Sequence, residues 1–94
     1  MDITKERFEH EMKKAKTFQG IEPDRADYWI GYQRGLRRAY HGENFGTERE
    51  HTLWLEAVNS DDPMRMARGE GYRDGLRGAR ANEARSPHTR GRGV

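Results

Sequence analysis

The feature that most constrains this chain is a six-residue pattern that occurs twice, as GYQRGL at residues 31–36 and as GYRDGL at residues 71–76. The copies are 40 positions apart, and the agreement continues outside them to give eight identities across 17 positions. The identical residues are Pro, Arg, Gly, Tyr, Gly, Leu, Arg and Ala, in that order. Self-similarity at a fixed offset is typical of repeated supersecondary units, so the sequence predicts a duplicated helical unit.

Both copies place glycines in the middle of stretches that otherwise have helical periodicity. A glycine inside a helix costs about 0.5 to 1 kcal/mol relative to alanine, so two in each copy require a compensating gain. Close approach of two backbones would supply it, with Gly31 and Gly35 forming one flat strip and Gly71 and Gly75 the other. The sequence leaves open whether the strips pack on each other about a pseudo-twofold axis or on a second chain. The competing interpretation is that the glycines only weaken two mediocre helices.

Helix signals in the first half of the chain predict two helices. Thr4 can cap the first, which has apolar residues at helical spacing and reaches about residue 20. Pro23 suits the first turn of the second, which runs to about His41 and ends before Gly42.

Two further helices are expected in the second half. Thr47 and Glu50 have the spacing of a capping box, which predicts a third helix that ends near Asn59. Pro63 suits the first turn of a fourth helix, which continues to about Arg85 because the next break is Ser-Pro at 86–87.

These signals predict an all-α fold, a four-helix domain built from two related helical hairpins. The domain spans 1–85, with hairpins at 1–42 and 47–85, and 86–94 form a flexible basic tail. Only 32% of the residues are hydrophobic, so the core is small, and a partner or a homodimer would be one way to complete it. The expected core residues are Trp29, Tyr32, Leu36, Leu55, Val58, Tyr72 and Leu76.

The composition points to a cytoplasmic protein with no membrane span. There is no cysteine, so disulfides and thiolate metal sites are excluded and a reducing compartment fits. The longest apolar runs are three residues, YWI and LWL, far below the ~20 that a membrane helix needs. The first residues are charged and have no apolar central region, which predicts that there is no secretory signal.

Charge is unevenly distributed along the chain. Residues 1–62 carry 10 basic and 13 acidic side chains, whereas residues 63–94 carry 8 arginines and 3 acidic residues. The second part is therefore net positive by five, although the whole chain is only +2. Arginine outnumbers lysine 14 to 4, and its planar guanidinium suits phosphates, carboxylates and aromatic faces. This pattern indicates an acidic partner.

Two clusters are candidate binding residues. On the predicted fourth helix, Arg73, Arg77 and Arg80 share one stripe and could contact phosphates; alternatively they form a solvated face that nearby acidic residues partly neutralise. The second cluster is on the predicted second helix, where arginines stand beside aromatic residues in a combination typical of interaction surfaces. Its members are Arg34, Arg37, Arg38, Trp29 and Tyr40.

The sequence offers little for catalysis. The four histidines are scattered over helix faces, a turn and the tail, and no third ligand or base follows from their spacing. We therefore expect a non-enzymatic protein with no metal and no cofactor, unless an oligomer assembles a shared site.

At IGYQRGLRR, followed by HTLWLEA, the chain resembles the ribosome modulation factor family, small helical bacterial proteins that dock on the small ribosomal subunit. ARGEGYRDGLRG resembles the same first segment again. The linker HGENFG and the pair Glu56-Ala57 depart from the family pattern, which has a proline-containing linker and a Gly-Trp there. The matching residues are Gly31, Tyr32, Gly35, Trp54 and Leu55, and separately Gly71, Tyr72, Gly75 and Gly78.

Two mechanisms for a binding protein remain open. The resemblance implies docking of the arginine and aromatic residues on RNA or a ribonucleoprotein. The alternative is a phage or mobile-element inhibitor, similar in size and charge density to anti-CRISPR proteins, that sterically blocks a host defence complex of proteins.

Overall fold

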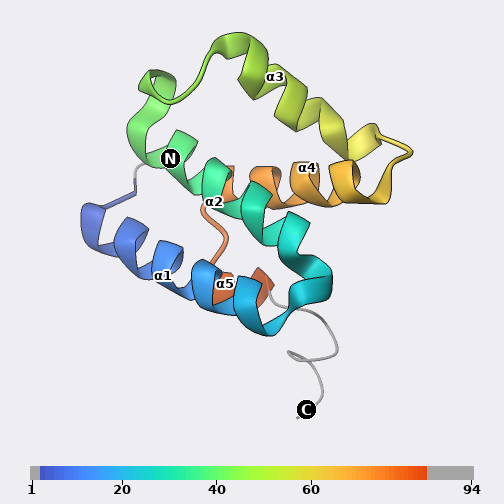
Figure 1. Cartoon of the computed structure of the whole chain (residues 1–94). Coiled ribbons are helices and arrows are strands. Elements are labelled where there is room, and N and C mark those ends of the chain that lie inside the picture. The colour runs from blue at the N-terminus through green and yellow to red at the C-terminus, as the bar shows by residue number, and fades with distance from the viewer. Residues whose placement is uncertain (1–2, 85–94) are drawn as a thin grey trace.

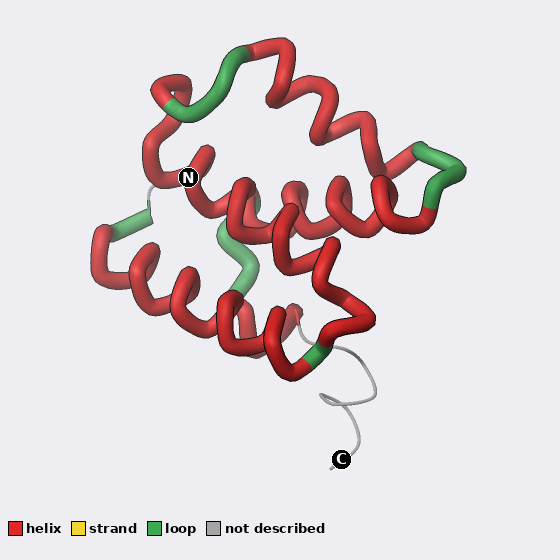
Figure 2. Tube along the Cα trace, viewed as in Figure 1, coloured by secondary structure: helices red, strands yellow, loops and turns green. Residues whose placement is uncertain are grey.

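The computed structural model describes residues 3–84, and over this range it consists of helices and loops (Figure 2). The α-helices are α1 (Lys5–Ile21), α2 (Ala26–His41), α3 (Glu48–Glu56), α4 (Pro63–Leu76) and α5 (Ala81–Ala84). Short 3₁₀ turns lie at Pro23–Arg25, Gly42–Asn44 and Ala57–Asn59. The predicted all-α class is confirmed. The predicted flexible tail, 86–94, lies outside the described residues.

Side-chain caps explain where α1, α3 and α4 begin, whereas α2 has no side-chain cap and begins at Ala26, because Pro23 lies in a separate 3₁₀ turn. The Thr4 hydroxyl accepts a hydrogen bond from the Arg7 backbone N–H (3.1 Å) at the start of α1. The predicted capping box is present at α3, where Thr47 and Glu50 each accept from the other's backbone N–H (3.1 and 2.9 Å). Asp62 caps α4, with a proline in the first turn. Such caps satisfy backbone donors that the helix itself leaves free.

The centre of the molecule is the contact between α2 and α4, with α1 on one side and α3 on the other (Figure 1). The glycine strips pack on each other here. A Cβ atom at any of four glycines would lie less than 3.0 Å from a backbone carbonyl oxygen of the facing helix. These glycines are Gly31, Gly35, Gly71 and Gly75. Only a residue without a Cβ atom fits at each of these positions.

The contacts between the two helices are reciprocal. Gly31 faces the carbonyl of Arg68, and Gly71 faces that of Tyr28, which lies 40 positions before Arg68. Gly35 and Gly75 repeat this relation with the carbonyls at positions 72 and 32. Because the contacts advance in the same direction on both helices, α2 and α4 run parallel. The contact thus has the pseudo-twofold arrangement that the glycine strips suggested.

Most of the hydrophobic core lies on the α1 side of this contact. Trp29, Tyr32 and Leu36 of α2 are fully buried, and Tyr72 is nearly so. Leu55, Val58 and Leu76 are half-buried, so the prediction that they belong to the core is wrong. The reason is that α3 is short and has no buried residue, whereas α1 packs a longer apolar face on α2. The remaining residues of this core cluster are Met12, Ala15, Phe18, Tyr28 and Ala81.

The prediction of a fourth helix that continues to Arg85 is also wrong, because α4 ends at Leu76. Gly78 adopts a positive φ of 80°, and its N–H bonds to the carbonyl of Gly75 (3.1 Å). The next N–H, of Ala79, bonds to the carbonyl of Asp74 (3.0 Å). This pair of bonds is a Schellman motif, which ends a helix at a glycine. The chain then turns back and forms α5 beside α1 (Figure 1).

Tyrosine hydroxyls of α2 donate hydrogen bonds to the end of α4 and to the turn that follows it. Tyr28 donates to Asp74 Oδ2 (2.6 Å), and Tyr32 donates to the carbonyl of Ala79 (2.5 Å). Burial raises the pKa of both hydroxyls above the usual tyrosine range, and hydrogen bonding to Asp74 adds to this for Tyr28. Both therefore remain protonated donors at neutral pH.

Over the described residues, none of the helices has the length and apolar character that crossing a bilayer requires.

Adding a methyl group at the centre of the helix contact should destabilise the fold. We expect Gly31→Ala or Gly71→Ala to lower the free energy of unfolding by about 1 to 3 kcal/mol or more, because the new Cβ would force the backbones apart. Gly20→Ala is the matched control, since no atom lies within 4 Å of its Cβ position, and it should stabilise by up to about 1 kcal/mol. Urea unfolding of the three variants tests this; stabilisation by all three would mean that the glycines only weaken their helices.

The buried tyrosines predict a fall in stability at alkaline pH. Above about pH 10 tyrosines ionise in the unfolded chain, while Tyr28 and Tyr32 keep their protons in the folded state. Unfolding then releases protons, so the free energy of unfolding should decrease with pH by up to about 1.4 kcal/mol per pH unit for each tyrosine. Below that pH this contribution is constant. Urea unfolding across this range should give a shallower slope for Tyr28→Phe than for the wild type, and equal slopes would contradict the assignment.

Candidate nucleic-acid interface

Trp29 is not available to a partner. It is 0% exposed, its indole N–H donates to Glu22 Oε1 (3.0 Å), and it packs against Phe18 and Tyr32. The interpretation of Trp29 as a surface anchor is therefore wrong. Its helix position faces α1, and burial of the aromatic ring stabilises the fold instead.

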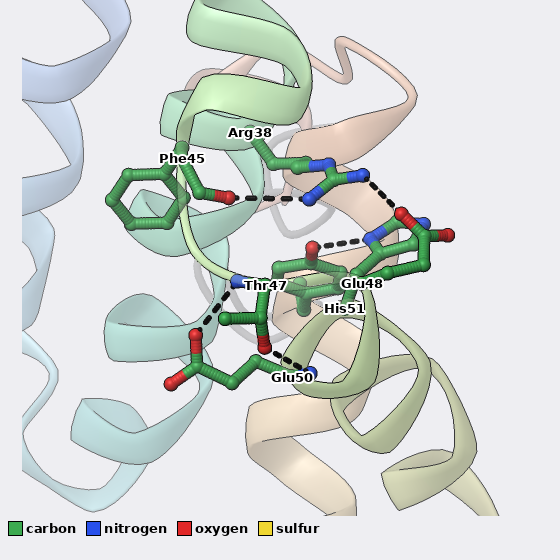
Figure 3. Close-up of polar contacts among 7 residues, drawn as sticks. Arg38, Phe45, Thr47, Glu48, Glu50 and His51 are labelled. Carbon is green, nitrogen blue, oxygen red and sulfur yellow. Dashed lines mark hydrogen bonds and ion pairs between the residues drawn. The ribbon is translucent and has the colours of Figure 1, made fainter.

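Two of the predicted binding arginines instead hold α3 to α2. Arg38 is only 8% exposed and donates to the carbonyl of Phe45 (3.2 Å) and to Glu48 Oε1 (3.0 Å) (Figure 3). The guanidinium of Arg34 lies 5.0 Å from the ring centre of Phe45 and 4.9 Å from that of Trp54. Cation–π contacts of this kind stabilise the packing of the loop and α3.

A further polar contact in this region fixes α3 on α4. His51 Nδ1 lies 2.6 Å from the hydroxyl of Tyr72. Burial raises the pKa of Tyr72, so its hydroxyl stays protonated in this contact. No spacing signal in the sequence indicated this pair, because the two residues lie on different helices.

The predicted stripe of three arginines is interrupted. Arg73 and Arg77 lie near the end of α4, with Arg73 40% exposed, but Arg80 follows the turn at Gly78 and belongs to a different segment. Its guanidinium lies 3.8 Å from Glu11 Oε2 of α1. The prediction that all three share one helix face is wrong, because that helix ends before Arg80 at Leu76.

Basic residues gather instead in a groove between α1 and α2. The groove is open, has a volume of about 460 Å³, and contains one acidic residue, Glu9. Lys13, Lys16 and His41 are exposed and Arg37 is half-buried. Among the described residues, no ion pair engages the two lysines or Arg37. The lining residues are Phe8, Glu9, Met12, Lys13, Lys16, Arg37 and His41.

Aromatic rings form one end of this groove. The rings of Phe8 and Tyr40 are stacked, with centres 4.4 Å apart and planes 9° from parallel. The His41 ring stands edge-on to both, at 5.8 and 4.9 Å. Of the predicted site residues, Arg37 lines this groove and Tyr40 lies next to it through its stacking on Phe8. The sequence missed Lys13 and His41 because nothing in it showed which faces of α1 and α2 meet.

This arrangement combines the two kinds of group that bind nucleic acids, cationic side chains and aromatic rings. Ammonium and guanidinium groups bind backbone phosphates, and exposed ring faces such as imidazole can stack on bases. Among the described residues, no three histidine, aspartate or glutamate side chains gather as metal ligands would. The groove is therefore a candidate nucleic-acid interface.

Comparisons of the chain with protein-family models, curated proteins and solved structures found no match.

Arg37 and Arg38 are adjacent, but the structure predicts different roles for them. Arg38→Gln removes two part-buried hydrogen bonds of a buried side chain and should lower the free energy of unfolding by about 1 to 3 kcal/mol. Arg37→Gln should change it by less than about 0.5 kcal/mol, because Arg37 has no ion-pair partner among the described residues. Urea unfolding of the two variants checks this, and an equal decrease in both would contradict the structural role of Arg38.

Proposed function

We propose that this chain is a non-enzymatic protein that docks on RNA or a ribonucleoprotein through the groove between α1 and α2. The observation that carries the proposal is the convergence of Lys13, Lys16 and Arg37 on one groove, where no described residue forms an ion pair with them. Cations without ion-pair partners attract a nucleic acid chain, because each contact with a phosphate releases counterions condensed on that chain.

The aromatic end of the groove supports RNA over a simple anion. Phe8 and Tyr40 stack on each other beside His41, an exposed residue whose ring also lies 6.4 Å from that of Phe45. Base stacking on such rings tolerates many sequences because every base has a flat face. We therefore propose single-stranded or looped RNA, with phosphates on the cations and a base beside His41.

The resemblance to the ribosome modulation factor family is consistent with a ribonucleoprotein partner, but its residues have another role in this structure. Gly31, Gly35, Gly71 and Gly75 lie in the helix contact. Trp54 lies beside Arg34 on the opposite side of that contact from α1. The residues that carry the resemblance thus concern the packing of the helices, and the proposal of an RNA partner rests on the basic groove.

The proposal predicts that RNA affinity depends on the groove cations and on salt. In Lys13→Gln/Lys16→Gln/Arg37→Gln, RNA binding should weaken, and its salt dependence should become shallower by about 0.7 for each phosphate that the variant no longer neutralises. The helices should remain, because glutamine is nearly as good a helix former as lysine and arginine. Fluorescence anisotropy with labelled single-stranded RNA over a salt series measures both quantities.

The matched control removes three charges outside the groove, in Arg49→Gln/Arg73→Gln/Arg77→Gln. It should keep most of the affinity, apart from a small general decrease due to net charge. An equally large decrease in this control would place RNA elsewhere on the surface. Absence of RNA binding by the wild type at low salt would contradict the proposal and favour the inhibitor hypothesis, in which the target is a protein complex.

A further inference from the structure

The second hairpin carries an apolar groove that lies apart from the proposed RNA contact. It runs between α3 and α4 with a volume of about 240 Å³, and Leu53 on its wall is 55% exposed. Drug-sized ligands usually occupy about 300 to 1,000 Å³, so this groove better suits one or two aliphatic side chains. The lining residues are Leu53, Trp54, Ala57, Arg65 and Arg68.

In the first hairpin, the corresponding surface is covered by the short helix α5. Lys14 Nζ donates to Asn82 Oδ1 (3.2 Å), and Arg25 Nη1 donates to the carbonyl of Ala84 at the end of α5 (2.9 Å). The Arg25 guanidinium also lies 4.2 Å from the ring centre of Tyr28. A short helix is thus bound through its side and through its C-terminal carbonyl.

Three of the five groove residues are the 40-residue counterparts of two residues that bind α5 and of the tyrosine that lies under one of them. The counterparts of Lys14, Arg25 and Tyr28 are Trp54, Arg65 and Arg68. The same offset relates the glycine contacts of α2 and α4, so counterpart residues occupy similar places in the two hairpins. The groove between α3 and α4 is therefore the equivalent of the surface that α5 covers.

The offset also holds for the packing of α1 and α3. Phe18 packs on Trp29 with ring centres 5.3 Å apart, and Val58 borders Gly69, the residue 40 positions after Trp29. The second hairpin has a glycine where the first has a tryptophan. It consequently packs less side-chain volume between its helices.

We infer that this groove binds a short helical segment of a partner protein, with aliphatic side chains on one face and a carboxylate near its C-terminal end. Trp54 in place of Lys14 makes the wall more apolar than the surface under α5, which favours aliphatic contacts. Arg65 is exposed and forms no ion pair with a described residue, so it can take a carboxylate in the way that Arg25 takes a carbonyl.

Charge and burial argue against occupants from this chain itself. Residues 85–94 contain three arginines and no acidic residue, so they would be repelled by Arg65 and Arg68. The α5 of a second copy is committed to its own fold, since Ala81 is fully buried there. The occupant is therefore a different protein. The inference does not depend on RNA binding by the other groove.

A library of displayed random peptides of about 16 residues, long enough to form a helix on binding, tests this with the full chain as target. We expect enriched peptides to share aliphatic residues at i and i+3 or i+4, followed by aspartate or glutamate. Leu53→Glu and Arg65→Glu should each lower the affinity for the most enriched peptide by about tenfold or more. Both side chains are exposed, so circular dichroism should show unchanged helicity.

Arg49→Glu is the matched control, because it makes the same charge reversal at an exposed position of α3 outside the groove. It should retain peptide affinity, and so should the Lys13→Gln/Lys16→Gln/Arg37→Gln variant. The inference is overturned if no peptide is enriched, if enriched peptides lack acidic residues, or if Leu53→Glu and Arg65→Glu bind as the wild type does. Displacement of the peptide by RNA, or self-association of the chain that Leu53→Glu abolishes, would assign the groove to those occupants instead.

Discussion

The structure depends on the approach of two backbones at four glycines. Where α2 and α4 cross, carbonyl oxygens of each helix occupy the space that side chains would fill on the other. This contact sets the distance and the parallel direction of the two helices, and it leaves α1 and α3 on opposite sides of the pair (Figure 1). Both grooves follow from that placement, because each lies between one of these helices and the central pair.

A contact made by backbones buries little side-chain surface, so other interactions must fix it. Hydrogen bonds of Tyr28 and Tyr32 reach across to the end of α4, and Asp27 pairs with Arg68 nearer the middle of that helix (2.7 Å). These bonds are directional, and an unsatisfied buried partner would be costly. The same glycine spacing brings helices together in membranes, where packing and hydrogen bonds replace the hydrophobic effect.

The two hairpins use the same central contact but complete it differently. The first fills its side with Phe18, Trp29 and the returning segment that carries α5. The second has Gly69 where the first has Trp29, and it holds α3 through Arg34 and other polar contacts. The first side is therefore a packed core with a basic outer groove. The second side retains an apolar opening between α3 and α4.

The sequence by itself determined where α1, α3 and α4 begin and which helix faces carry the glycines, because caps and helical periodicity are local properties of a few neighbouring residues. The Thr47–Glu50 capping box and the strips at Gly31 and Gly71 could be predicted for that reason. Tertiary structure decided the rest. Periodicity places Trp29, Arg38 and Arg37 on α2, but only the arrangement of α1, α3 and α4 determines that the first two are buried and the third lines a groove. The turn at Gly78 likewise separates Arg80 from α4. Gly78 has a positive φ there, and the N–H groups of Gly78 and Ala79 bond to the last carbonyls of the helix.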